Sequence, residues 1–214
     1  MTPIIRRSVY LALLFCCFTL PATAQEPDST KRGDNYYHSG KQSSEFSFFA
    51  ATRQRNQQRQ TNSCWAACIQ MLLNSHGMFV TQRELMRDLF GNLPDIPAFH
   101  EDILTALSES RAIKRGAKKL EYEVFEVAYP EELTSVVQKR GPMIVEIDSP
   151  GDSLRHIVVL SEIFYSNTLY ENPVIDKVVL RDPWPTGSPR LELSWIQFKT
   201  RKPLVFSIWF KEKS

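Results

Sequence analysis

A cysteine stands at the start of an apolar run, and a glutamine precedes it by six positions: these residues are Cys64 and Gln58. Residues 64–75 are apolar on nearly every helical face, which predicts a buried helix that begins at Cys64. The free N–H groups and partial positive charge of a helix N-terminus favour a thiolate. The same amides, with Gln58 as a further donor, could hold an oxyanion. The pattern therefore predicts a cysteine nucleophile.

A cysteine nucleophile needs a base, and four histidines compete for that role. His38 lies in a polar stretch near the N-terminus, and His76 lies at the far end of the predicted helix. His100 opens a surface helix. His156 differs from these because it follows a turn-like segment and starts an apolar strand, so its ring would emerge at a strand end. His156 is therefore the base candidate, although a histidine taken alone is more often a structural residue.

A third group should orient the imidazole through its second nitrogen. Asp182 ends an apolar strand and is followed by Pro183 and Trp184, so its carboxylate would be held at a strand-to-loop junction and shielded by the indole. Asp-Pro is also a common turn starter, which is the structural alternative for this position. The chain order Cys, His, Asp favours the functional interpretation.

The elements that must position these residues divide into helices followed by strands. Helices are predicted at residues 64–75, 81–91 and 99–108, the second opened by a capping box. Strands are predicted at residues 122–127, 142–147, 156–160, 174–181 and 204–210, with a short helix at 131–139. This is an α+β pattern, in which an N-terminal helical half with a central buried helix packs against a C-terminal antiparallel β-sheet half.

The first 24 residues have the form of a signal peptide. Arg6 and Arg7 make a basic region, residues 9–20 an apolar run and residues 22–24 a small-residue cleavage site. The apolar run is too short to span a bilayer. We therefore expect a secreted or periplasmic protein with no stable membrane insertion once the signal, residues 1–24, is removed.

The remaining chain divides into a leader and one domain. Residues 25–46 are polar without a hydrophobic period, which predicts a flexible leader, and residues 47–214 are long enough for one domain with a real core. Without Arg6 and Arg7, the 26 basic residues become 24 and balance the 24 acidic residues. This near-neutral charge does not favour a nucleic acid partner.

Signal removal also reduces the four cysteines to two, Cys64 and Cys68. The mature protein therefore has no disulfide framework, although its predicted compartment is oxidising. Cys68 is expected to fill the core one helical turn below the site, with a redox partner of Cys64 as the alternative. A metal site from Cys64, Cys68 and His76 fits no common zinc spacing, so no metal or cofactor is expected.

The chain resembles the papain-like cysteine peptidases, and especially their compact bacterial branch near the bacteriocin-leader (double-glycine) peptidases. The resemblance covers roughly residues 47–210, and its most specific part is the motif that begins at Cys64. It implies that Gln58 donates to the oxyanion, Cys64 attacks, His156 is the base and Asp182 orients the imidazole. It also implies a peptide or protein substrate.

This chain departs from papain at several positions. Thr61 stands where papain has a disulfide cysteine, and Asp182 replaces an asparagine. His156 follows Cys64 by 92 residues (156 − 64), against about 130 in papain-type enzymes. Gln57 and Gln60 flank Gln58, so the oxyanion assignment depends on spacing alone.

The predicted function is that of an exported thiol hydrolase that cleaves a peptide or related amide bond through an acyl-enzyme. Two alternatives remain open from the sequence. One is a catalytically silent papain-like binding module, and the other is an acyltransferase or transglutaminase-like enzyme that uses the same triad.

Overall fold

The structure is a computed structural model of the whole chain. It describes residues 29–32, 35–41, 57–109, 114, 118–149, 155–169 and 172–212. The predicted signal peptide, residues 1–24, lies outside the described residues. Within the described part, no helix is long and apolar enough to span a membrane.

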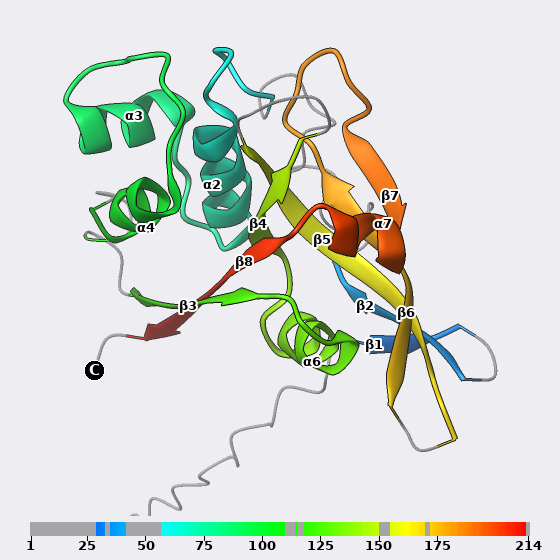
Figure 1. Cartoon of the computed structure of the whole chain (residues 1–214). Helices are drawn as coiled ribbons and strands as arrows, with labels where there is room; N and C mark the ends of the chain where they lie inside the picture. The colour runs from blue at the N-terminus through cyan, green and yellow to red at the C-terminus, as the bar shows by residue number, and fades with distance from the viewer. Residues whose placement is uncertain are drawn as a thin grey trace, which may run out of the picture.

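Three helices form the N-terminal half and lie together beside the sheet (Figure 1). They are α2 (Cys64–Ser75), α3 (Gln82–Phe90) and α4 (His100–Glu109). The capping box predicted for α3 is present, with Thr81 accepting from the Glu84 N–H and Glu84 accepting from the Thr81 N–H. Helix α3 ends at Gly91, whose φ of 71° is the left-handed conformation that glycine adopts at low cost.

The sheet is eight-stranded and antiparallel and takes two of its strands from the N-terminal region; its order is β1-β2-β5-β4-β8-β3, and β6 also pairs with β5 and carries β7. Its long central strand is β5 (Arg155–Asn167). The other strands are β1 (Ser29–Lys31), β2 (Tyr36–Gly40), β3 (Lys118–Glu126), β4 (Met143–Asp148), β6 (Pro173–Arg181), β7 (Arg190–Ser194) and β8 (Leu204–Glu212). Two further helices, α6 (Pro130–Arg140) and α7 (Trp195–Thr200), pack on this sheet. The predicted α+β class is confirmed.

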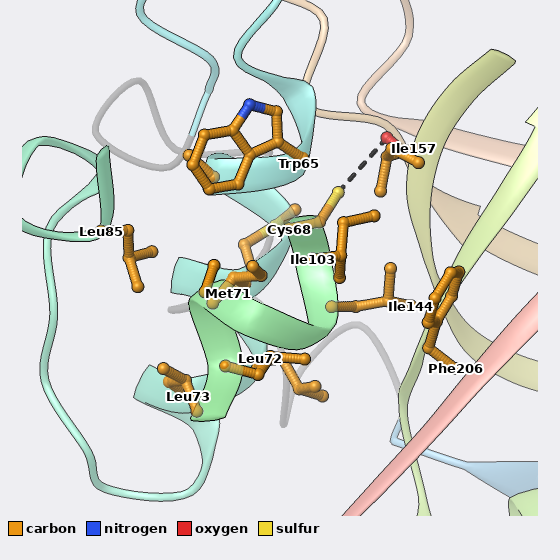
Figure 2. Packing of buried hydrophobic residues seen from close by; sticks show 14 of the residues in the cluster. Trp65, Cys68, Met71, Leu72, Leu73, Leu85, Ile103, Ile144, Ile157 and Phe206 are labelled. Carbon is orange, nitrogen blue, oxygen red and sulfur yellow. Dashed lines mark hydrogen bonds between the residues drawn. The ribbon is translucent and has the colours of Figure 1, made fainter. Parts of the chain in front are cut away.

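Both faces of the sheet are buried because helices pack on each of them. Successive residues of a strand point to opposite faces and so enter different clusters. Ile157 and Val159 of β5 pack in a first cluster with helix α2, whereas Val158 and Leu160 pack in a second cluster with α6 and α7. Figure 2 shows the first cluster, in which side chains of α2 meet Ile157 and other strand residues. Helix α2 is therefore the buried central helix that its all-round apolar sequence predicts.

The N-terminal region differs from the flexible leader predicted over residues 25–46. Strand β2 lies within it and pairs antiparallel with β5, with His38 opposite Phe164. The His38 side chain, which lies within the predicted leader, is only 2% exposed. Gly40 has a φ of 100°, and a Cβ atom there would lie 2.3 Å from the Ser161 carbonyl oxygen. The close approach of β2 to β5 therefore needs a glycine at this position.

Candidate active site

Cys64 is the first residue of helix α2, directly after the N-cap Ser63. The first hydrogen bond of the helix runs from the Ala67 N–H to the Ser63 carbonyl oxygen at 3.2 Å, so the Cys64 amide lies ahead of the helical ladder. The thiol is reduced and half-buried. Cys64 thus combines an accessible sulfur with the amide groups of a helix N-terminus, as its sequence context predicts.

His156 is the second residue of β5 and pairs with Ile147 of β4, so a continuous sheet fixes its backbone. Its Nε2 atom lies 2.8 Å from Oδ1 of Asp182. Burial lowers the pKa of His156, but hydrogen bonds to Asp182 and Cys64 raise it more, to about 10. With this pKa, His156 is an imidazolium at neutral pH. Since Nε2 contacts Asp182, the hydrogen bond to Cys64 is assigned to the other ring nitrogen, Nδ1.

Asp182 follows β6 directly and is held by the loop that continues from it. Its N–H donates to the Pro189 carbonyl oxygen at 3.2 Å, and its Oδ1 accepts from the Trp184 N–H at 2.9 Å. The Trp184 ring stands edge-on to His156, with ring centroids 6.5 Å apart and an interplanar angle of 83°. The indole therefore covers the His156–Asp182 pair from one side.

Gln58 lies next to these residues but points its donors elsewhere. Its Nε2 donates to the carbonyl oxygens of Gln60 at 3.0 Å and Thr61 at 2.8 Å. Its Oε1 is buried and has no hydrogen-bond partner among the described residues. Its backbone N–H donates to the Pro183 carbonyl oxygen at 2.9 Å, which joins this segment to the loop after Asp182. In this conformation both amide hydrogens of Gln58 hold the loop that leads to Cys64.

A cleft of about 330 Å³ opens at Cys64, His156 and Asp182. Its lining consists of Thr61, Asn62, Cys64, Pro97, Ser149, Arg155, His156, Asp182 and Trp184. A larger hollow of about 450 Å³ adjoins it and shares Arg155. The structure thus brings Cys64, His156 and Asp182 into one cleft and leaves Gln58 outside its lining.

Sequence reasoning missed Arg155, which shapes the start of β5. Its guanidinium pairs with Glu146 at 2.8 Å and Asp148 at 3.1 Å, and also donates to the Lys202 carbonyl oxygen at 2.6 Å. These contacts tie the residue before His156 to β4 and to the loop before β8. The sequence signal for Arg155 was its position directly before His156, the base candidate.

Cys68 lies one turn below Cys64 and is fully buried. Its Sγ donates to the Ile157 carbonyl oxygen at 3.3 Å, as Figure 2 shows. Burial raises the pKa of the Cys68 thiol well above its ordinary value, and electrostatic interactions with Cys64 and Asp182 raise it further. Cys68 is therefore a core residue without access to the cleft.

The other sequence candidates lie elsewhere. His38 is buried against Glu162, at 3.2 Å, and His76 packs on the Phe210 ring with centroids 4.8 Å apart. His100 lines the adjoining larger hollow. Among the residues that the structure describes, no cluster of three His, Cys, Asp or Glu side chains is arranged to hold a metal ion.

Comparison with known proteins places these observations in a family. Residues 48–201 match the family described as papain-like cysteine protease AvrRpt2. One similar solved structure is the peptidase domain of Streptococcus ComA, a bifunctional ABC transporter involved in a quorum-sensing pathway. It is 18% identical with a TM-score of 0.49, and the match covers 73% of this chain and 96% of that chain.

A second similar structure is a double glycine motif protease from an AMS/PCAT transporter, solved in complex with the leader peptide. It is 16% identical with a TM-score of 0.45, and the match covers 73% of this chain and 89% of that chain. No curated protein sequence matches the chain significantly.

Proposed function

The chain belongs to the AvrRpt2 family of papain-like cysteine proteases, and we propose that it cleaves peptide bonds through an acyl-enzyme on Cys64. The observation that carries this proposal is the chain of contacts in one cleft. Cys64 at a helix N-terminus meets His156, and His156 meets Asp182 at 2.8 Å. A nucleophile, a base and an orienting group in that order are what acyl transfer requires.

The first half of the reaction starts from an ion pair. His156, with a pKa of about 10, carries the proton at neutral pH, and the nucleophile of the proposed reaction is the Cys64 thiolate, the reactive form of a cysteine. The sulfur attacks the carbonyl carbon of the substrate and an oxyanion forms. His156 then donates its proton to the leaving amine, the C–N bond breaks and a thioester remains on Cys64.

In the second half, a water molecule replaces the amine. His156, now neutral, takes a proton from the water as it attacks the thioester carbonyl carbon. The C–S bond then breaks, the peptide acid leaves and the ion pair is restored. Asp182 keeps Nε2 engaged throughout, so Nδ1 faces the reacting atoms.

The oxyanion takes its donors from the Cys64 N–H and from the Gln58 side chain. The Cys64 amide lies ahead of the helical ladder. Gln58 reaches the oxyanion by exchanging one of its two carbonyl partners, Gln60 or Thr61, for the reacting oxygen. A donor aimed at the charge that develops on the oxyanion stabilises the transition state more than the bound substrate.

We also infer that the protein is exported. The support is the basic region with Arg6 and Arg7, the apolar run at residues 9–20 and the small residues at 22–24. Mass spectrometry of protein from the cell envelope and medium tests this, with an N-terminus at Gln25 as the expected result. An N-terminus at Met1 would contradict export by a cleaved signal.

The test of the catalytic proposal is iodoacetamide labelling of the mature protein followed by mass mapping. Cys64 is expected to react fast and Cys68 slowly, because Cys68 is buried. A His156→Ala variant should slow Cys64 labelling, and a matched Cys68→Ala variant should not. Slow labelling that is unchanged by His156→Ala would overturn the activated pair and favour a binding module.

Turnover is tested with a mixture of peptides and mass spectrometry. Wild-type protein is expected to produce cleaved peptides, and Cys64→Ala none. Addition of a primary amine separates hydrolysis from acyl transfer, since a transferase would yield amide products in place of free acids. No cleavage and no transfer, with a normal labelling rate, would reject peptides as the substrate class.

A further inference from the structure

Two buried glutamines join helices α2 and α3 behind the proposed oxyanion donor. Gln70 of α2 is 8% exposed and Gln82, the first residue of α3, is 4% exposed. The Gln82 Nε2 donates to Oε1 of Gln70 at 3.0 Å, and the Gln70 Nε2 donates to the Val80 carbonyl oxygen at 3.2 Å. Both amides therefore have defined orientations.

The Gln82 side chain also holds the backbone on both sides of Gln58. Its Nε2 donates to the Gln57 carbonyl oxygen at 2.8 Å, and its Oε1 accepts from the Arg59 N–H at 3.1 Å. One carboxamide thus pairs with the segment as a neighbouring strand would, with one donor and one acceptor. Gln58 lies between the two anchor points.

The opposite side of the same segment is attached to the loop that follows Asp182. The Gln58 N–H donates to the Pro183 carbonyl oxygen at 2.9 Å, and the Gln57 Nε2 donates to the Pro185 carbonyl oxygen at 3.4 Å. Residues 57–59 belong to no helix or strand. Their backbone is therefore held by Gln82 on one side and by the Asp182 loop on the other.

Packing alone does not explain two amides at this place. A buried amide costs free energy unless its donors and acceptor are satisfied, and an apolar side chain would join two helices without that cost. The Gln82 amide is satisfied by the backbone of Gln57 and Arg59 and by the Gln70 side chain. The polar contact thus serves the segment rather than the helix pair.

We propose that Gln82, oriented by Gln70, is a positioning residue that sets the place of Gln58 at the oxyanion. This rests on the proposed function, in which Gln58 donates to the oxyanion. Gln82 does not touch substrate and acts through the Gln57 and Arg59 backbone. The amide of Gln82 is thereby part of the catalytic apparatus, although it belongs to the first turn of α3.

The experiment compares Gln82→Met with Gln138→Met. Methionine keeps the length of glutamine without its amide, and Gln138 is a control on α6 whose amide donates to the Tyr165 hydroxyl at 2.6 Å. For each variant we would measure kcat and KM with a cleavable peptide, and the rate of Cys64 alkylation by iodoacetamide. Circular dichroism at the assay temperature verifies folding.

Gln82→Met is expected to lower kcat about tenfold, less than the roughly 10²–10³ for loss of an oxyanion donor, with KM within about twofold. The alkylation rate should be unchanged, because alkylation forms no oxyanion. Gln138→Met should change neither rate. A fall in hydrolysis and alkylation together would overturn the proposal, since it would show general disorder of the site.

A double variant separates this proposal from the proposed function. If Gln82 acts through Gln58, Gln58→Ala with Gln82→Met should have the same kcat as Gln58→Ala alone. Two results would reject the positioning role of Gln82 and leave the oxyanion role of Gln58 intact. One is a lower kcat in the double variant than in Gln58→Ala, and the other is an unchanged kcat in Gln82→Met while Gln58→Ala is impaired. An unchanged kcat in Gln58→Ala would reject the oxyanion role itself, and Gln82's role with it.

Discussion

The protein contains two buried polar networks that differ in charge. The amide network consists of Gln70, Gln82 and the backbone beside Gln58. The ionic network consists of His38, Glu162 and Arg181, with Arg181 donating to Glu162 at 2.8 Å and Glu162 lying 3.2 Å from His38. Each network ends next to a proposed site residue, because Arg181 directly precedes Asp182.

The two networks hold different kinds of structure. The ionic network joins strands β2, β5 and β6, and its Arg181 is 1% exposed and its Glu162 3% exposed. Strong charge pairing inside the sheet resists displacement but leaves a costly charge when one partner is lost. The amide network holds a loop through neutral hydrogen bonds, each worth much less. The strand that leads to Asp182 is therefore held more strongly than the loop segment around Gln58.

The largest effect is expected from breaking the ionic network with Arg181→Met. Urea unfolding should show a loss of about 3–5 kcal/mol, because Glu162 is left buried without its main partner. The double variant Arg181→Met/Glu162→Leu should recover most of that loss, since it removes the orphaned charge. A double variant as unstable as the single one would show that packing, and not charge pairing, carries this network.

Next in size is the pH dependence, which separates the role of Asp182 from that of Gln82. Burial lowers the pKa of His156, and the hydrogen bonds that its ring makes to Asp182 and Cys64 raise it, to about 10 overall. The imidazolium and the stability that it contributes are therefore complete below pH 6.5 and lost as the pH rises through about 10.

Asp182→Asn should therefore move the alkaline limb of kcat/KM to lower pH by about 1–3 units. Gln82→Met should leave the limb in place, because Gln82 makes no contact with the imidazole. Rate profiles of both variants against pH provide the comparison. A limb that moves in Gln82→Met would mean that the amide network also acts on the imidazole of His156.

A smaller loss of stability is expected when the amide network is broken. Gln82→Met should lower the free energy of unfolding by about 1–2 kcal/mol, because neutral hydrogen bonds are lost and no charge is stranded. Urea unfolding in the same buffer as for Arg181→Met gives the contrast directly. Equal losses for the two variants would remove the distinction between the networks.

The smallest effect is expected from an exposed ion pair in the same sheet. Lys177 of β6 lies 2.7 Å from Glu192 of β7, with both side chains about one-third exposed. Lys177→Met should change the free energy of unfolding by less than about 1 kcal/mol, because solvent screens the pair. A loss comparable to that of Arg181→Met would show that burial is not what strengthens the ionic network.

The helices and the three residues of the cleft were predictable because their signals are local. Thr81 and Glu84 form the capping box that their spacing predicts, and the all-round apolar residues 64–75 form the buried helix. His156 and Asp182 stand at strand ends, as their neighbours in the sequence indicate. The predicted superfamily is likewise confirmed, by the family match over residues 48–201.

The rest was hidden because it depends on distant partners. Strand β2 has no apolar alternation of its own, and its His38 pairs with Glu162, 124 positions away. Sequence reasoning also treated Gln82 only as part of a capping box, since its contacts with Gln57 and Arg59 arise from the packing of a loop. The direction of the Gln58 amide is likewise set by loop backbone that no residue pattern specifies.

The edge-on contact of Trp184 with His156 places a natural fluorophore at the site. Indole emission is quenched by a neighbouring protonated imidazole and recovers when the ring becomes neutral. Of the four tryptophans in the chain, Trp184 is the one that contacts His156. The fluorescence lost in a Trp184→Phe variant therefore isolates one reporter. Its brightening as the pH passes about 10 would record the proton leaving His156 without a substrate or a label.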